Sequence, residues 1–460
     1  MKNVKYVVIG IGVLMIILLV IFVGMYKFNY LVGKDWYDVD GNMEQNEEIV
    51  EEGFKKDVVQ IKKSWQLIRD DEGMLQADIL YSKDIGKRKI VEDTREYQHG
   101  VDFLQKSDGE YILVWSSGGN GLRPLGARAD GEWIHDVYYS DIDSDKPVVN
   151  PVKIIKAPLA QEPASSAINN DGHVMITMED AWQAKNTLAQ TYAVYDENME
   201  AIKPYQQVVF DGGHSGHVAA VGNKFVVFYS DEWVEGGGVD NLGSGDDVLL
   251  SVHDTNGDFI NKKNVAVGNQ TRDWWPLVVG SEENALLLWQ RFVDGETYAN
   301  LVFSMYNPHN NEYIKEGIVL KEEIKYYTYT VEYLEAIDKF LVLGTSIDGK
   351  GFGVLISAQG EVISENYDIP AIVREAQPAI KSFEGGNVQI VYPASSDKLG
   401  VVAITATDIK VEGEVIVDYI WETAGTDGIF LKDNSVYFVS LSPAGLKELR
   451  VKMYEELNSY

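Results

Sequence analysis

Several groups of charged, amide and aromatic side chains stand shortly before a series of short turns that recur along the chain. The groups are His99; His214 with His217; Arg272, Asp273, Trp274 and Trp275; and Arg374, Glu375 and Gln377. Because each group holds the same place relative to its turn, an architecture that repeats with these turns would bring them together. Polar and aromatic side chains that converge on a concavity form the kind of site that binds ligands. The alternative, a polar surface that only binds water, stays open.

Two further tryptophans, Trp115 and Trp233, stand beside long loops at 116–133 and 230–247. Long loops on one rim of a scaffold often carry function. An exposed tryptophan there could stack on a sugar ring or anchor a protein partner. Each tryptophan could equally cover the strands from which it comes.

Catalysis has a narrower basis in the sequence. A glycosidase needs two carboxylates across a cleft, and Asp273, Glu375, Asp231 and Glu232 are candidates. A sialidase needs several arginines, which Arg123, Arg272, Arg291 and Arg374 could supply. The Ser-x-Asp-x-Gly-x-Thr-Trp boxes of sialidases, serine-nucleophile motifs, phosphate loops and cysteine nucleophiles do not occur in the sequence.

The sequence offers weak metal sites. His99, His214 and His217 have no fourth ligand with suitable spacing, so we predict no transition-metal site and no cofactor. Carboxylates at 141–145 and 254–258 have spacings that could hold calcium. Solvated turns at hairpin tips are the alternative, so calcium remains open.

The turns that follow these residue groups belong to a repeat of a turn and an apolar strand. Its copies begin at Gly109, Gly172, Asn223, Asn284, Asp338, Asn387 and Asn434, with spacings of 47 to 63 residues. A second strand with an acidic or glycine-rich turn recurs within most copies, for example at 252–260. Two hairpins per copy make four strands, and a spacing of about 50 residues is typical of a propeller blade. We therefore predict an all-β fold, a single β-propeller of about seven four-stranded blades, with six or eight as alternatives.

The strand that leads into each of these turns should line the channel of such a propeller, with the polar group before that strand at the channel mouth. The segment 58–91 should supply either an eighth blade or strands that close the ring. Since Trp274 and Trp275 are adjacent at the start of a strand, they should point to opposite faces. One of them should then be core and the other should reach the ligand.

The repeat resembles, in architecture alone, bacterial extracytoplasmic β-propeller repeat proteins. The resemblance covers about residues 54–457, and the Trp-Asp, Tyr-Trp-Thr-Asp and kelch Gly-Gly signatures do not occur at blade spacing. It therefore implies a fold and transfers no functional residue.

The N-terminal residues predict a membrane anchor. Residues 6–26 are uncharged and apolar and, as a helix, would span roughly 30 Å, the thickness of a bilayer's hydrocarbon core. No small-x-small cleavage pattern ends the run. We predict a cytoplasmic tail at 1–5, a transmembrane signal anchor at 6–26, an acidic stalk at 27–56 and a β-propeller at 57–460. The protein is then expected in the cell membrane as a single-pass protein with its bulk extracytoplasmic.

The net charge of the chain limits the classes of partner that it can bind. With 71 acidic and 40 basic residues the formal net charge is −31, and a surface of this sign repels nucleic-acid phosphates. The chain has no cysteine, so it gains no stability from disulfides. We expect a binding or scaffold module for a glycan, peptide or protein at the cell surface. The alternative is a carbohydrate-active enzyme, a glycoside hydrolase or lyase, with carboxylates at the channel mouth.

Overall fold

The computed structural model describes residues 63–84, 100–117, 136–142, 152–157, 161–180, 188–231, 247–268, 271–383, 385–417, 425–442 and 445–459. All of them belong to one compact unit, Lys62–Tyr460. The predicted membrane anchor and stalk, and the residues His99, Arg123 and Trp233, lie outside the described residues. Within the described ranges, no helix is long and apolar enough to cross a membrane.

The described residues fold into antiparallel sheets in which most strands pair with their neighbours in the chain. Three four-stranded sheets come first: β3 (Val101–Gln105), β4 (Tyr111–Ser117), β5 (Asp136–Ile142) and β6 (Val152–Ile155); β7 (Gln161–Ile168), β8 (Val174–Asp180), β9 (Ala189–Tyr195) and β10 (Ala201–Asp211); β11 (His214–Val221), β12 (Lys224–Ser230), β13 (Val248–His253) and β14 (Phe259–Ala266). A seven-stranded sheet follows: β15 (Asp273–Gly280), β16 (Ala285–Phe292), β17 (Ala299–Asn307), β18 (Glu312–Leu334), β19 (Lys339–Ser346), β20 (Gly351–Ser357) and β21 (Val362–Ile369).

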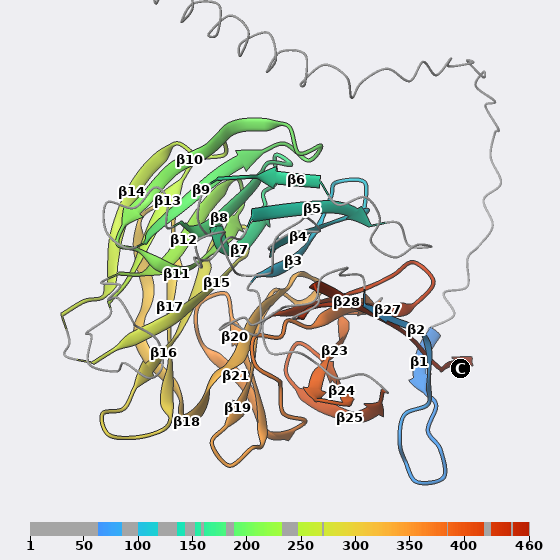
Figure 1. Ribbon diagram of the computed structural model, residues 1–460. Coiled ribbons are helices and arrows are strands. Elements are labelled where there is room, and N and C mark those ends of the chain that lie inside the picture. Colours follow the sequence, from blue (N-terminus) through green and yellow to red (C-terminus); the bar gives the residue numbers. More distant parts are fainter. Residues whose placement is uncertain are drawn as a thin grey trace, which may run out of the picture. The chain divides into compact units, whose positions relative to one another are not determined.

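Two more four-stranded sheets complete the set. They are β22 (Ala379–Phe383), β23 (Asn387–Ser395), β24 (Lys398–Ile404) and β25 (Ile409–Ile416); and β26 (Thr426–Phe430), β27 (Ser435–Ser442), β28 (Gly445–Met453) and β2 (Ala77–Asp84). A two-stranded ribbon joins β1 (Lys63–Leu67) to β29 (Glu455–Ser459), and one short 3-10 helix, η1 (Glu335–Ile337), precedes β19. The sheets follow one another around a common centre in chain order (Figure 1). This is a β-propeller, and the all-β prediction is confirmed for the described part of the chain.

The predicted repeat corresponds to the sheets. Six of the repeat's seven turns lie between the first and second strands of a sheet, as Gly109 does between β3 and β4, and the turn at Asp338 lies between β18 and β19. The second turn of the repeat lies between the third and fourth strands. At Asp254, for example, the side-chain Oδ1 accepts hydrogen bonds from the backbone N–H groups of Asn256 (2.9 Å) and Asp258 (2.8 Å). The apolar run at 286–289 lies in β16, the second strand of its sheet, and is buried on both faces.

The burial pattern along each strand agrees with the position of that strand in its sheet. The third strands β9, β13 and β20 are buried throughout, because sheets on both sides cover them. The fourth strands β10, β14 and β21 alternate between exposed and half-buried residues, as expected for an outer strand with one face in water.

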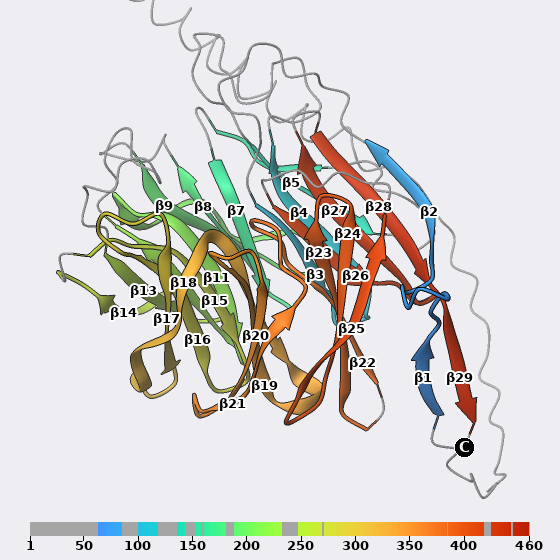
Figure 2. The same ribbon diagram turned by 90° about the horizontal axis from the view of Figure 1, so that it is seen from below.

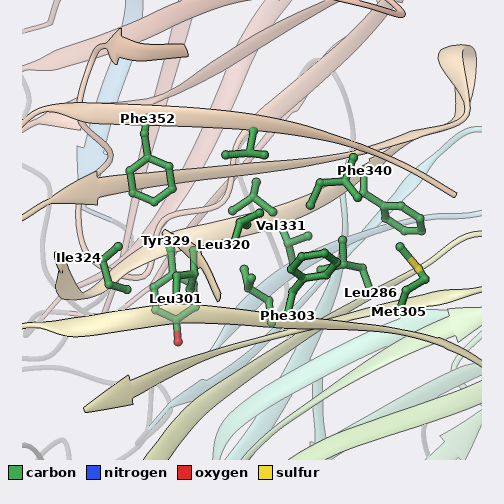
Figure 3. Packing of buried hydrophobic residues seen from close by; sticks show 14 of the residues in the cluster. Leu286, Leu301, Phe303, Met305, Leu320, Ile324, Tyr329, Val331, Phe340 and Phe352 are labelled. Carbon is green, nitrogen blue, oxygen red and sulfur yellow. The ribbon is translucent and has the colours of Figure 1, made fainter. Parts of the chain in front are cut away.

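Strand β18 is shared by the two halves of the seven-stranded sheet. Its first part pairs with β17 and its second part with β19, and the register shifts between Ile324 and Tyr329. Glu323 and Tyr327, at this change of partner, both have positive φ angles (58° and 60°). The two halves bury a large apolar cluster between them, in which Phe303, Phe340 and Phe352 take part (Figure 3).

The last sheet is built from both ends of the described chain. Its outermost strand β2 pairs with β28 in register Ala77↔Met453, and β1 pairs with β29 beyond it (Figure 2). The segment 58–91 was predicted to supply either an eighth blade or strands that close the ring. Its described part, residues 63–84, closes the ring. A salt bridge of 3.1 Å between Lys381 and Glu455, both almost buried, ties β22 to β29.

Candidate functional site

The innermost strands surround the central channel and are joined to one another by an unbroken series of hydrogen bonds. In chain order the donor–acceptor links are Ser166 N to Asp102 Oδ2, Val218 N to Ser165 Oγ, the His217 ring to Pro276 O, Tyr329 Oη to Trp275 O, Glu375 N to Tyr327 O, Thr426 N to Glu375 O, and Phe103 N to Asp427 Oδ2. The link from the last sheet to the first closes the series. Backbone groups that have no partner inside their own sheet are thereby satisfied at the channel wall.

Several inner strands begin with a bulge at the same point. Ser215, Trp275, Tyr327 and Glu375 have φ angles between 52° and 60°, and the pairing shifts register beside the first three. A bulge of this kind changes the direction in which side chains point. Trp275 and Glu375, which share this positive φ angle, line the channel.

Two glycines allow the inner strands to approach one another closely. A Cβ on Gly280 would lie 1.7 Å from the carbonyl oxygen of Ala220 on the next strand. A Cβ on Gly100 would lie 2.0 Å from the carbonyl oxygen of Ala164. Any larger residue at either position would push two blades apart, so these glycines set the width of the channel.

The channel contains a cavity of about 320 Å³. Small and apolar residues of the inner strands, such as Val101, Val218, Val279 and Val331, form much of its wall. The polar and aromatic residues that line it are Asp102, Ser165, Ser166, His217, Trp275, Tyr329, Thr330, Glu332, Glu375 and Gln377. Of the predicted site residues, the structure thus brings His217, Trp275, Glu375 and Gln377 to one cavity.

Three carboxyl groups share this region and hold their protons more tightly than in water. Burial raises the pKa of Asp102 to about 6, although Ser166 and Gln377 donate hydrogen bonds to its carboxylate at 2.5 and 3.1 Å. The pKa of Asp427 lies well above its ordinary value because the group is buried, with repulsion from Asp102 adding to the effect. The pKa of Glu332 is raised for the same two reasons, burial first and then the charges of Asp427 and Asp102.

His217 is a neutral member of the cavity wall. Burial lowers the pKa of its imidazole to about 4. The ring Nδ1 lies 2.8 Å from the carbonyl oxygen of Pro276, and since a carbonyl oxygen only accepts, Nδ1 carries the proton. The ring also meets Trp275 edge-to-face, with 5.4 Å between the ring centroids.

A second group of predicted site residues packs away from the cavity. Trp274 is 4% exposed, and the Arg272 guanidinium lies 3.5 Å above its ring. The ring of His214, which is fully buried, lies 4.8 Å from that of Trp274 between centroids. Arg272, Trp274 and His214 thus pack together where two sheets meet, and none of the three lines the channel cavity. Trp274 and Trp275 do have different surroundings, as predicted, with Trp274 in the core.

Asp273 is also a structural residue. It is fully buried, and its Oδ1 accepts hydrogen bonds from Trp289 Nε1 at 2.8 Å and Arg291 Nε at 2.7 Å. Its Oδ2 accepts a third bond from Arg291 Nη2 at 3.2 Å. Since Asp273 and Arg291 satisfy each other inside one sheet, Asp273 cannot act with Glu375 as a pair of carboxylates across a cleft.

The remaining predicted residues take mixed positions. Arg374 Nε donates to Glu375 Oε1 at 2.7 Å, and the Arg374 guanidinium lies 4.4 Å from the centre of the Tyr327 ring. Trp115 is 4% exposed and stacks on Tyr138 at 5.7 Å, so it covers its own sheet. Glu375 therefore reaches the cavity already paired with a cation.

The structure gives no support to a calcium site at 254–258. Asp254 Oδ1 there already accepts two backbone N–H groups, and Asp258 forms an ion pair with Lys203. Within the described ranges, no group of three or more His, Asp or Glu side chains is placed to hold a metal ion. Residues 143–145 of the other candidate lie outside the described residues.

Sequence reasoning missed Asp102 and Glu332. Each is a single acid within an apolar strand, in Val101-Asp102-Phe103-Leu104 and Val331-Glu332-Tyr333-Leu334. The available signal was a single acidic residue within an otherwise apolar inner strand. A charged residue is costly there, because neighbouring sheets cover such a strand.

No protein-family model and no curated protein matches the sequence. Solved structures of similar fold include the sialidase of Trypanosoma rangeli, at 12% identity and TM-score 0.42, with 71% of this chain and 56% of that chain covered. The WD40 domain of Toxoplasma gondii coronin has 6% identity and TM-score 0.47, with 83% and 87% covered. A protein of unknown function from Dyadobacter fermentans has 9% identity and TM-score 0.45, with 82% and 100% covered. This chain spans a little over half the length of the sialidase, and its structural neighbours are sialidase and WD40 propellers.

Proposed function

We propose that this protein is a membrane-anchored, extracytoplasmic binding module that holds its ligand at the mouth of the propeller channel. The observation that carries the proposal is the cavity of about 320 Å³, into which Trp275 of β15, Glu332 of β18 and Gln377, just before β22, converge. Apolar walls with a few converging polar groups are typical of small-molecule sites. The uncharged run at 6–26 supports the anchored location.

The propeller has seven blades in this proposal. Five four-stranded sheets and the two halves of the seven-stranded sheet, which share β18, account for that number. The hydrogen-bonded series around the channel leaves no gap for a further blade among the described strands. A closed ring holds the cavity walls at fixed distances, so the site is pre-organised for its ligand.

A carbohydrate-active enzyme is the second candidate. The specific observation in its favour is a pair of cavity carboxyls, Asp102 and Glu332, whose pKa values burial raises, to about 6 for Asp102. A general acid needs such a raised pKa. Asp102, however, bridges two inner strands through Ser166, which favours a structural role for it.

The binding proposal is tested with two neighbouring tryptophans. The full chain and its Trp275→Ala and Trp274→Ala variants are screened on a glycan array and by pull-down from cell-surface extracts. Trp275→Ala should weaken binding by about 2 kcal/mol or more, as removal of a central aromatic does. Trp274→Ala, which empties a buried site, should instead lower the free energy of unfolding by about 3–5 kcal/mol.

The result that contradicts the proposal is a partner whose affinity is unchanged by Trp275→Ala and by Gln377→Ala. The working surface would then lie away from the channel. The enzyme candidate is decided by mass spectrometry of any glycan that binds. Cleavage by the full chain that Glu332→Gln abolishes would support the hydrolase, and an intact glycan supports the binding module.

A further inference from the structure

The cavity wall carries acidic groups without basic ones. Asp102, Glu332 and Glu375 line it, and among the residues that the structure describes no lysine or arginine does. The charge of Glu375 is offset by Arg374, and the pKa of His217 is lowered to about 4, so its imidazole is neutral near pH 7. Asp102 and Glu332 therefore have no cation beside them in the cavity wall.

The two carboxyls differ in their hydrogen bonds. Asp102 accepts bonds from the Ser166 backbone and hydroxyl and from Gln377. Glu332 is half-buried, and neither a hydrogen bond nor an ion pair joins its carboxyl group to another described residue. A charged group at such a depth is costly unless a partner satisfies it. No feature of the fold requires an acid there, since β18 presents apolar or uncharged residues at the neighbouring positions Thr330 and Val331.

An aromatic ring lines the same cavity as these carboxyls. Trp275 is held edge-on by His217 and by Tyr327, whose ring centroid lies 5.2 Å away. The Trp275 carbonyl oxygen accepts a hydrogen bond of 2.6 Å from Tyr329, whose own ring is buried in the core between the halves of the seven-stranded sheet. Since these contacts fix the Trp275 ring, it costs little to order when a ligand binds. A carboxylate together with an aromatic face is the combination that recognises organic cations.

We propose that the cavity binds a small organic cation, whose ammonium or guanidinium group lies against Glu332 and Asp102 and whose carbon atoms contact Trp275. A bound cation would supply the missing partner of the Glu332 carboxyl group and offset its repulsion by Asp102 and Asp427. A cavity of about 320 Å³ is at the small end of ligand sites, which suits a monosaccharide-sized amine or a single basic side chain. This inference rests on the proposed function and names the class of ligand for the same site.

The test uses charged probes with neutral counterparts of the same shape. Choline is compared with 3,3-dimethylbutan-1-ol, and glucosamine with glucose, by isothermal titration and by tryptophan fluorescence of the full chain. Each cation should bind at least about tenfold more tightly than its neutral counterpart, as expected for a hydrogen-bonded or paired charge. A lysine-rich peptide is the third probe, and tighter binding of the peptide than of either small cation would identify a partner's side chain as the source of the charge.

Two substitutions on strand β18, one in the cavity and one on the surface, provide the control for cation binding. Glu332→Gln should weaken cation binding at least about tenfold and leave neutral probes unaffected. Glu322→Gln, an exposed position on the same strand, should change nothing. Melting curves of both variants should show folded protein, since Glu332 has no partner to lose.

Cations and neutral counterparts that bind equally, or cation binding that survives Glu332→Gln, would overturn the inference. So would failure of all three cationic probes to bind below about 10 mM, a weaker affinity than most specific complexes have. If the screen finds a neutral or anionic ligand that depends on Trp275, the binding proposal stands and only the cation inference fails.

Discussion

The buried carboxylate of Asp273 allows a quantitative test of its structural role. Asp273→Ala removes three hydrogen bonds, leaving the Trp289 indole N–H and the Arg291 guanidinium without this acceptor inside the sheet. Asp273 is fully buried and the Arg291 side chain is 25% exposed, so part of the guanidinium's loss is recovered by water. Breaking one partner of a buried pair costs about 3–5 kcal/mol, and we expect a value near the middle of this range.

The size of the domain converts that energy into a melting temperature. An unfolding entropy of about 2.1 cal/mol/K per residue gives about 0.8 kcal/mol/K for roughly 400 residues. A loss of about 4 kcal/mol therefore lowers Tm by about 5 °C. Urea unfolding followed by tryptophan fluorescence measures the free energy, and scanning calorimetry measures Tm.

Two variants serve as controls for this test. Asp294→Ala changes an exposed aspartate between β16 and β17 and should leave stability unchanged. Adding Arg291→Met to Asp273→Ala should recover part of the lost stability, because the unpaired charge is then gone. A change below about 1 kcal/mol for Asp273→Ala, or no recovery in the double variant, would refute the buried-pair reasoning. A catalytic role for the Asp273 carboxylate would then be open again.

Three further predictions concern the anchor, the ring and the channel acids. Intact-mass analysis of protein extracted from membranes should find residues 6–26 retained, and a secreted form that begins near residue 26 would contradict the anchor. Ending the chain at residue 418 removes β26 to β28 and leaves β2 without a partner, so cooperative unfolding should be lost; an unchanged melt would mean an open array. The folded-state pKa of Asp102 is raised to about 6, so its ionisation lowers the free energy of unfolding as pH rises from about 4 to 6. The stability of Asp102→Asn relative to the unmodified protein should therefore increase over that interval and stay constant above it, and urea melts from pH 4 to 8 that show a constant difference would contradict the burial argument.

Much of the architecture could be predicted because it repeats. Each hairpin turn needs glycine, asparagine or aspartate, and each covered strand needs a continuous apolar run, so seven similar copies reinforce a weak local signal. The strands on either side of both turns of the repeat lie where they were expected. Strand β2, near the start of the described chain, completes the last sheet, which is one of the two roles predicted for its segment. The merging of two sheets through β18 was not predicted, since the sequence at 312–334 contains no proline or strong turn signal to break the strand.

The site was predicted only in part. Repeat phase correctly indicated that His217, Trp275, Glu375 and Gln377 would meet at the channel. Arg272, Asp273 and Trp274 are buried away from the cavity instead, because residues one or two positions apart in a bulged segment point in different directions. Which residue of such a run faces the channel depends on the bulge, and the bulge depends on how the neighbouring sheet packs.

The sequence by itself determined the all-β class, the repeat, the acidic surface and the place of each inner strand, because these depend on local turn chemistry and on the period of apolar residues. Only the tertiary structure decided which acids share the cavity. Asp102 and Glu332 stand 230 positions apart in the chain, on β3 and β18, and closure of the ring brings their charges within reach of each other. Their raised pKa values are a property of that closure, since burial and mutual repulsion exist only when the sheets surround one channel.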